Sequence, residues 1–170
     1  MSNKLKVLVL GITSNVGFKF YSEYKDKFNI YGTYRTPNSK IKFSDKFIKL
    51  SDLSKKELSK VINKIKPNII INCIALGSLD QCEREKENCM RINFVLVKNL
   101  SSIIKNLKIK LVHFSSNAIY DGKKAPYNEN SKRIPLNNYG KFKLKADEFI
   151  QNNLNNYLIL RPITLIGFNE

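Results

Sequence analysis

The sequence contains no tryptophan, one histidine and three cysteines among its 170 residues. The histidine, His113, is remote in sequence from the cysteines, and no two cysteines have the Cys-x-x-Cys spacing of a zinc site. We therefore expect no metal site. Cys73 falls in an apolar run, and Cys82 and Cys89 stand seven positions apart on an expected helix. We interpret all three as buried or half-buried free thiols.

Long apolar runs are also absent. No stretch of 18 apolar residues occurs, so we expect no membrane helix. The first residues, MSNKLKVLVLG, combine a basic start with apolar residues, but the apolar stretch covers only residues 7–10 and no small-residue cleavage site follows. We interpret this stretch as a first β-strand and expect a cytoplasmic protein.

Acidic residues are scarce, 14 against 30 basic ones, which gives a net charge of +16. Such a charge raises nucleic acid as a partner. However, the excess is lysine spread along the whole chain, and no basic run is interleaved with aromatic residues as single-strand binding requires. We expect a positive field that attracts an anionic small substrate, and no nucleic-acid function. A homodimer stays open.

Apolar runs and helical patterns alternate along the chain. Short apolar runs predict strands at residues 6–10, 30–34, 47–50, 68–75, 110–114 and 157–161. Helical periodicity and capping signals predict helices at residues 16–28, 55–66, 83–106 and about 139–153. This alternation predicts a single α/β domain over residues 1–170, a doubly wound Rossmann sheet with strand order 3-2-1-4-5-6. The irregular segment 121–137 then lies at the carboxyl end of the fifth strand, where such sheets bind ligands.

A glycine turn, Gly11 to Gly17, stands directly between the first strand and its helix. This placement lets the backbone approach a pyrophosphate at a helix N-terminus. The middle glycine of the strict fingerprint is replaced by Ser14. The alternative is a plain turn in which Thr13, Ser14 or Asn15 caps the helix.

The end of the second strand bears on the choice of cofactor. NAD sites place a carboxylate there for the ribose 2′-hydroxyl, whereas an arginine accommodates the 2′-phosphate of NADP. Here the strand ends in TYRTPNSK, with Arg35 and no acid nearby, which favours NADP(H) over NAD(H). An exposed arginine on a loop of a basic protein is the alternative. Asp52 and Leu53 follow the third strand, within expected reach of the adenine.

Three Tyr-x-x-x-Lys patterns occur, at residues 21–25, 120–124 and 139–143. The spacing places two side chains on one face only if the segment is helical. Residues 120–124 span a glycine turn, and Tyr21 belongs to the apolar stripe of the first helix. Tyr139 begins a helix after the fifth strand's loop, where its hydroxyl lies above the carboxyl edge of the sheet. We therefore select Tyr139 and Lys143.

Ser115 and Ser116 end the fifth strand and bring a second hydroxyl to this edge. A tyrosine with a pKa of about 10 is not ionised at neutral pH, and we expect the Lys143 ammonium to lower that pKa. Tyr139 would then exchange a proton with substrate while Ser116 hydrogen-bonds the developing oxyanion. A nucleophilic serine is not favoured, because His113 is expected to pack in the core.

Taken together, these segments resemble the extended short-chain dehydrogenase/reductase family, and within it the sugar-nucleotide reductases of the dTDP-4-dehydrorhamnose reductase type. The motifs that carry the resemblance run in the family's order across residues 5–167: GITSNVG, KPNIIINCIA, SLDQCE, MRINF, HFSSNAIYDG, IPLNNYGKFKLKADEF and LILRP.

The resemblance implies roles by position. Ser116, Tyr139 and Lys143 match the catalytic residues. The remaining positions implied to contact the cofactor are Gly11, Ser14, Asn15, Val16, Gly17, Arg35, Asp52, Leu53, Cys73, Ile74, Ala75, Leu76, Ser115 and Pro162, together with Tyr139 and Lys143 themselves.

This chain also departs from the family pattern. Asn117 stands where these reductases carry an aspartate, and Phe142 where they carry a small serine or threonine. Family members continue beyond the sixth strand into a lobe that holds the nucleotide sugar, so we expect a dinucleotide-binding domain without that lobe.

The resemblance implies NADPH-dependent reduction of a dTDP-4-keto-6-deoxy sugar in polysaccharide-precursor synthesis. Two alternatives remain: a non-catalytic NADP-binding regulatory subunit or inactive fragment, and a nucleotide-sugar epimerase or dehydratase.

Overall fold

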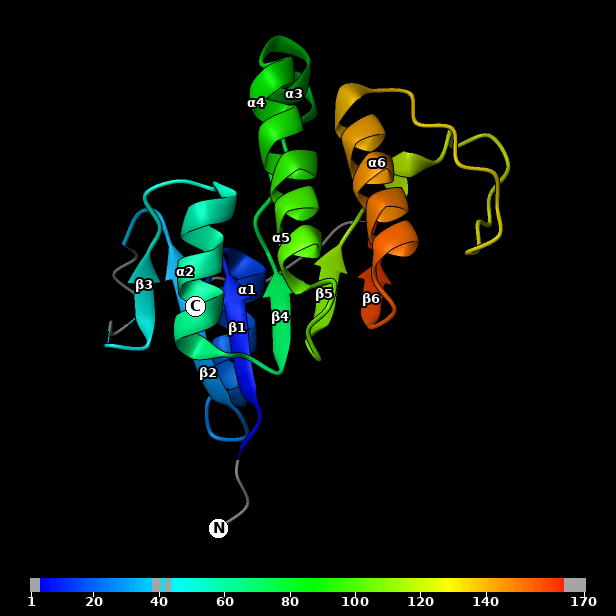
Figure 1. The fold of residues 1–170 in the computed structure, drawn as a ribbon. Helices are drawn as coiled ribbons and strands as arrows, with labels where there is room; N and C mark the ends of the chain where they lie inside the picture. Colours follow the sequence, from blue (N-terminus) through cyan, green and yellow to red (C-terminus); the bar gives the residue numbers. More distant parts are fainter. Residues whose placement is uncertain (1–3, 38–40, 42–43, 164–170) are drawn as a thin grey trace.

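The computed structural model describes residues 4–37, 41 and 44–163, which form one six-stranded parallel sheet. The strands are β1 (Lys6–Leu10), β2 (Asn29–Tyr34), β3 (Phe47–Lys49), β4 (Ile69–Asn72), β5 (Lys110–Phe114) and β6 (Tyr157–Leu160). Their order is β3-β2-β1-β4-β5-β6, so the predicted doubly wound fold is confirmed (Figure 1). The first three strands extend the sheet to one side and the last three to the other, so the strand order switches between β1 and β4. Such folds bind ligands at this switch point.

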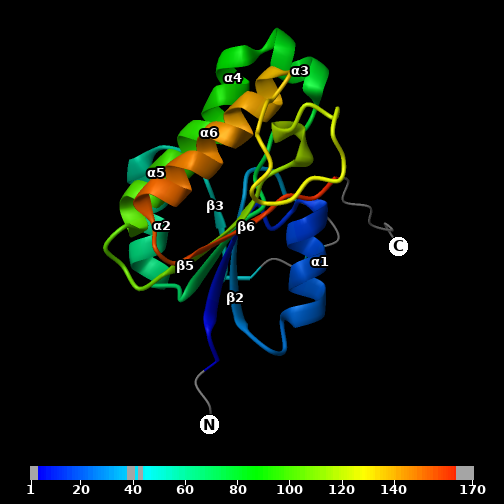
Figure 2. The ribbon, with the colours of Figure 1, turned by 90° about the vertical axis from the view of Figure 1, so that its right-hand side faces the viewer.

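Helices cover the two faces of the sheet unequally (Figure 2). On one face lie α2 (Lys55–Ile65), α5 (Leu96–Ile104) and α6 (Asn138–Asn153). They bury the main core against alternate residues of β1, β4 and β5, including Leu8, Leu10, Ile70 and Leu111. On the other face, α1 (Asn15–Tyr24) is the only helix of the described chain.

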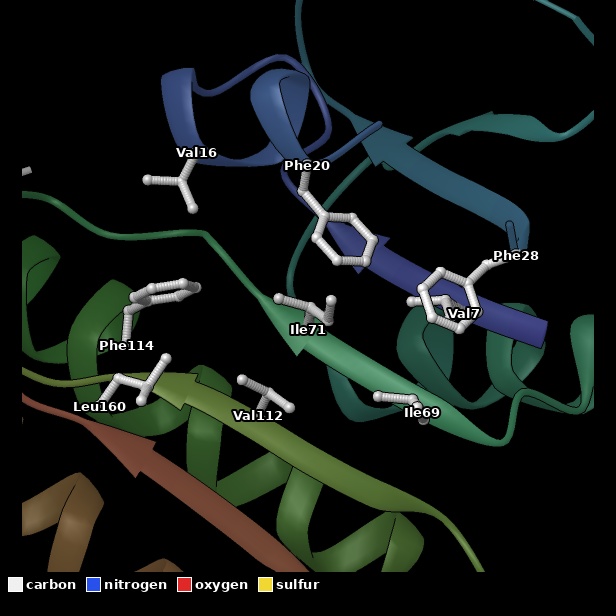
Figure 3. A pocket seen from close by; sticks show the side chains of 9 residues that line it. All are labelled: Val7, Val16, Phe20, Phe28, Ile69, Ile71, Val112, Phe114 and Leu160. Carbon is white, nitrogen blue, oxygen red and sulfur yellow. The ribbon is translucent and has the colours of Figure 1, made fainter. Parts of the chain in front are cut away.

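The face that carries α1 leaves an open apolar groove beside that helix, with a volume of about 300 Å³. Figure 3 shows the side chains that line it, from α1 and its following loop and from four strands: Val7, Val16, Phe20, Phe28, Ile69, Ile71, Val112, Phe114 and Leu160. The groove therefore runs from β1 across β4 and β5 toward β6, the part of this face that α1 does not reach.

The prediction of one continuous helix over residues 83–106 is wrong. The segment starts earlier and divides into α3 (Leu79–Arg84), α4 (Lys86–Met90), a π-helical turn η1 (Arg91–Val95) and α5. Glu85 leaves the helical region, with φ −114° and ψ 55°, which ends α3 and turns the chain. Apolar periodicity does not record a single non-helical residue of this kind.

That turn also corrects the interpretation of the cysteines. Cys82 and Cys89 form a disulfide, and only Cys73 is a free thiol. In an uninterrupted helix, Cα atoms seven residues apart are separated by about 10.5 Å along the axis. The break at Glu85 brings the Cα atoms of Cys82 and Cys89 to 5.0 Å, within bonding range for a disulfide.

Element boundaries differ by a few residues from those expected. β4 ends at Asn72 rather than at residue 75, and α1 ends at Tyr24 rather than at residue 28. Ser54 caps α2, since its Oγ accepts a hydrogen bond from Glu57 N at 3.3 Å. The reciprocal half of a capping box is replaced, because Ser54 N donates to Asp52 Oδ1 at 2.7 Å and not to Glu57. None of the helices in the described ranges has the length and apolar composition needed to cross a membrane.

Candidate functional site

The turn after β1 is held by the end of the neighbouring strand. Thr33, buried at the end of β2, accepts backbone hydrogen bonds from Gly11 N at 3.1 Å and Ile12 N at 2.8 Å. Ser14 is the N-cap of α1, because its Oγ accepts from Gly17 N at 3.1 Å and donates to Gly11 O at 2.7 Å. Ser14, at the position of the missing glycine, thus stabilises the turn by bonding both of its ends, Gly11 and Gly17.

Two glycines of this turn are required by its geometry. Gly11 has φ +80°, a conformation that side chains rarely adopt. A Cβ on Gly17 would lie 2.4 Å from Gly11 O, so the first turn of α1 packs directly on the end of β1. Residues 11–17 therefore form a tight glycine turn in which Ser14 caps α1, as the alternative interpretation also expected.

A cleft of about 660 Å³ opens above the carboxyl ends of β1, β2 and β4. Nine of the residues expected to contact a cofactor line it: Gly11, Ser14, Arg35, Asp52, Leu53, Cys73, Ile74, Ala75 and Leu76. The structure also brings into it residues that the sequence did not indicate: Thr13, Thr33, Tyr34, Thr36, Leu50, Ser51, Gln81, Asn88, Arg91 and Ile92. Gln81, Asn88 and Arg91 reach the cleft only because α3, α4 and the π-helical turn fold over it.

Other expected cofactor residues lie outside this lining. Asn15 is exposed at the start of α1, and the side chain of Val16 points into the apolar groove on the sheet's α1 face (Figure 3). Gly17 is buried against the turn. Pro162 lies just after β6, and its carbonyl accepts a hydrogen bond from Asn117 N at 3.2 Å.

The cleft wall at residues 73–76 is fixed by two buried asparagines that sequence reasoning missed. Asn93 makes paired hydrogen bonds with the backbone of Leu76, accepting from its N at 3.2 Å and donating to its O at 3.1 Å. Asn72 Oδ1 accepts from Ile74 N at 3.2 Å. Polar residues in otherwise apolar segments were the available signal for both.

Burial also affects the one thiol in this wall. Burial raises the pKa of Cys73 to about 12, so its thiol is protonated at neutral pH. The pKa of Asp52, which also lines the cleft, shifts the other way, because hydrogen bonds with Ser54 lower it. The cleft therefore presents a carboxylate at Asp52, a cation at Arg35 and an inert thiol at Cys73.

The selected trio comes together at the end of β5. Ser116 is the N-cap of the short 3-10 helix η2 (Asn117–Ile119), and its Oγ accepts from Ala118 N at 3.1 Å. Asn137 caps α6 by accepting from Gly140 N at 2.8 Å, which starts the helix one residue before Tyr139. Tyr139 and Lys143 then share one face of α6, with the Lys143 Nζ 5.9 Å from the centre of the Tyr139 ring.

The other two Tyr-x-x-x-Lys patterns have structural roles. Tyr21 packs edge-on against Phe47, with ring centres 5.2 Å apart. Tyr120 donates a hydrogen bond from its hydroxyl to Asn128 O at 3.0 Å and stacks on Tyr127. Gly122, inside the second pattern, has φ +77°, so that segment is a turn and not a helix.

The expected effect of Lys143 on the pKa of Tyr139 is wrong for this structure. Burial raises the pKa of Tyr139, and a hydrogen bond with Ser116 opposes that rise without cancelling it. The Lys143 ammonium instead donates to the carbonyl of Phe114, at the end of β5. Tyr139 is therefore a protonated phenol at neutral pH, the form that donates a proton.

Lys143 itself is buried, with 1% of its surface exposed. Burial lowers its pKa to about 8, and the charge of Asp147 acts in the opposite direction. His113 is also buried, as expected, and pairs with Asn72 across β4 and β5 at 3.3 Å. Burial and then the charge of Lys143 lower the pKa of His113 well below its ordinary value, so the imidazole is neutral.

Residues 5–169 match the RmlD substrate binding domain family. The chain belongs to this family. The resemblance to sugar-nucleotide reductases that the motifs indicated is thereby confirmed.

This RmlD-family chain is similar in sequence or structure to three proteins described next. It is 29% identical to methionine adenosyltransferase 2 subunit beta of Xenopus tropicalis over 95% of its own length and 47% of the relative's. It is 29% identical to dTDP-4-dehydrorhamnose reductase of Salmonella typhimurium over 62% of its length and 36% of the relative's. The crystal structure of dTDP-4-dehydrorhamnose reductase from Bacillus anthracis in complex with NADP superposes with a TM-score of 0.80 at 25% identity, covering 94% of this chain and 53% of that one. This chain thus spans about half the length of its curated relatives.

The two departures from the reductase pattern have structural consequences. Asn117 Oδ1 accepts a hydrogen bond from Ser116 Oγ at 3.4 Å, so the amide contacts the hydroxyl that an aspartate was expected to flank. Phe142 is buried against the Cys82–Cys89 disulfide, and Leu76 and Tyr139 pack on the same cluster. Leu76, which lines the cleft, and Tyr139 therefore pack against the same buried cluster.

Within the residues described, no group of three or more histidine, cysteine, aspartate or glutamate side chains could hold a metal ion.

Proposed function

We propose that residues 1–170 form the dinucleotide-binding unit of an NADPH-dependent reductase of a dTDP-4-keto-6-deoxy sugar, acting in polysaccharide-precursor synthesis. The observation that carries the proposal is the arrangement of Ser116, Tyr139 and Lys143 at the end of β5, where Tyr139 packs on the same buried cluster as Leu76 of the cleft wall. The similarity to dTDP-4-dehydrorhamnose reductases supports the substrate class.

The cleft residues fit a phosphorylated dinucleotide. The backbone at Gly11 and Gly17 leaves no room for side chains, which permits close approach to a pyrophosphate at the α1 N-terminus. The exposed Arg35 stands at the end of β2 where a 2′-phosphate would lie. The cleft volume falls within the range of about 300–1,000 Å³ of small-molecule sites.

Bound NADPH would supply a hydride to the substrate's carbonyl carbon. Tyr139, protonated at neutral pH, would donate its phenolic proton to the carbonyl oxygen, which becomes the alcohol. Ser116 would stabilise the negative charge on that oxygen as it develops, since its hydroxyl lies beside Tyr139. Lys143, anchored to the Phe114 carbonyl, would stabilise the phenolate that remains on Tyr139.

The test measures binding and turnover separately. Fluorescence titration with NADPH and NADH should show binding of both, with NADPH tighter. Oxidation of NADPH with dTDP-4-keto-6-deoxymannose should fall about 10²–10⁴-fold in Tyr139→Phe, with cofactor binding retained. Tyr21→Phe, from the structural Tyr-x-x-x-Lys pattern, is the matched control and should keep the wild-type rate. Equal rates in wild type and Tyr139→Phe would remove Tyr139 from the chemistry.

A second candidate is a subunit that binds NADP without turnover. Two observations favour it: the match to methionine adenosyltransferase 2 subunit beta covers 95% of the chain, and an apolar groove is open on the α1 face of the sheet. NADPH binding without substrate-dependent oxidation, together with co-elution with a methionine adenosyltransferase, would favour this function. Substitution of Val112 by glutamate in the groove should then abolish co-elution and leave NADPH binding intact.

A further inference from the structure

A buried carboxylate lies one helical turn beyond the lysine of the trio. Asp147 follows Lys143 by four positions on α6, so the two side chains share a face of the helix. Both are buried, with exposures of 0% and 1%. Burying either charge alone is costly, which makes their proximity a feature that requires an explanation.

Asp147 connects three elements of the fold. Its Oδ2 accepts a hydrogen bond from Ser115 Oγ at 3.0 Å, at the end of β5, and one from Arg161 Nε at 3.0 Å, just after β6. Its Oδ1 is buried and has no hydrogen-bond partner. Both hydrogen bonds thus use one oxygen, and the charge of this buried carboxylate also acts on its neighbours through space.

The charges around Lys143 show in which direction the carboxylate of Asp147 shifts the pKa of Lys143. His113 on β5 is neutral, Tyr139 on α6 is a neutral phenol, and Arg161 after β6 is positive. Asp147 is the one anion that acts on Lys143 among the described residues. Burial raises the pKa of Asp147, and the hydrogen bonds from Ser115 and Arg161, with the charges of Arg161 and Lys143, oppose that rise. Without Asp147, burial would act on Lys143 unopposed and favour loss of its proton.

We propose that Asp147 is a positioning residue of the reductase site, which keeps the buried Lys143 protonated beneath Tyr139 and fixes α6 to the ends of β5 and β6. This inference rests on the proposed function for its catalytic meaning, although the effect on Lys143 is a property of the protein alone.

The charge balance shows why such a residue serves the proton transfer. Before the transfer, Lys143 and Arg161 are positive and Asp147 is negative, which leaves one surplus positive charge beneath a neutral phenol. After Tyr139 gives its proton to the substrate oxygen, the phenolate brings the sum to zero. Neutralising Asp147 would release the Lys143 proton instead, and the ammonium that stabilises the phenolate would be lost.

The experiment measures the pKa of Lys143 in the ligand-free protein by NMR of lysine labelled at Cε. The Lys143→Met spectrum identifies the signal. In Asp147→Asn, the proton affinity of Lys143 should fall about tenfold or more. Glu148→Gln removes the same charge from the next, exposed position of α6 and should leave Lys143 unchanged. An unaltered Lys143 titration in folded Asp147→Asn overturns the proposal.

A measurement on the unmodified chain covers the case in which Asp147→Asn does not fold. The wild-type Lys143 signal should move twice, once as Lys143 titrates and once at acidic pH as Asp147 takes up a proton. A signal that ignores the acidic step overturns the proposal.

Activity adds a further readout that separates the two proposals. In Asp147→Asn, kcat/KM should begin to fall at a lower pH than in wild type, because Lys143 loses its proton earlier. Asp147→Glu should restore the wild-type pH profile. Absence of NADPH oxidation in wild type would contradict the proposed function, while the NMR titration would still decide the role of Asp147.

Discussion

The Lys143 ammonium lies 5.9 Å from the centre of the Tyr139 ring and donates its hydrogen bond to the Phe114 carbonyl, not to the phenol. The spacing of α6 places the two residues on one face, and the hydrogen bond to the end of β5 fixes Lys143 without a bond to Tyr139. Their protonation follows from burial: the pKa of Tyr139 is raised and that of Lys143 is lowered to about 8.

Lys143 should make stability depend on pH in a defined window. Its pKa falls from 10.5 to about 8 on folding, so between these values the unfolded chain binds more protons and stability rises with pH. The free energy of unfolding of wild type minus that of Lys143→Met should rise by about 3 kcal/mol across the window. Urea unfolding from pH 7 to 11 measures this difference. The exposed Lys145→Met should give a flat difference curve.

Gly140 should tolerate no side chain. A Cβ there would lie 2.1 Å from Ala118 O, a backbone atom of η2 that cannot move without shifting Ser116. Gly140→Ala should therefore lower the free energy of unfolding by about 1–3 kcal/mol and separate Tyr139 from Ser116. Gly77→Ala is the matched control, because a Cβ at that site meets nothing within 4 Å. Equal stabilities of the two variants, by urea unfolding, would contradict this packing.

Arg35 should decide the preference between cofactors. Loss of a charged hydrogen bond to a phosphate costs about 1.5–3 kcal/mol, so Arg35→Gln should weaken NADPH binding about 10–100-fold. NADH binding should stay unchanged, because that cofactor has no 2′-phosphate. Arg133→Gln removes a charge from a half-buried arginine that donates to Gln151, outside the cleft lining, and serves as the control. A parallel loss of NADH affinity in Arg35→Gln would point to a general role of the charge.

Thiol titration should distinguish the three cysteines. In the native protein no thiol should react rapidly, because the half-buried Cys73 thiol has its pKa raised to about 12, and Cys82 and Cys89 are bonded. After denaturation one thiol should react, and after reduction three. Three reactive thiols before reduction would show that Cys82 and Cys89 are free in the isolated protein.

Much of the fold could be predicted from the sequence, since the signals are local. Buried parallel strands are short apolar runs, and the capping serine at Ser54 stands where a capping box predicts it. Strand order followed from the alternation of strands and helices. Tyr139 could be selected from three equivalent patterns because only residues 139–143 are helical and follow β5.

What could not be predicted depends on contacts between distant segments. The break at Glu85 has no apolar signature, and without it Cys82 and Cys89 lie on one face of a helix but two turns apart, too far for a disulfide. The link between Asp147 and Arg161 requires the end of β6 to lie beside α6. The pKa of Tyr139 was misjudged for a similar reason: spacing places a lysine nearby, but only the folded structure shows how far burial outweighs it.

The π-helical turn Arg91–Val95 makes the site sensitive to the number of residues in this segment as well as to their identity. It holds one residue more per turn than an α-helix, and such turns are frequent at functional sites. Deleting one residue there would rotate α3 and α4 about 100° relative to α5. Arg91 would leave the cleft and Asn93 would lose Leu76, although every other side chain was retained. Homologues should therefore keep both the length of this segment and the asparagine at position 93, which holds Leu76.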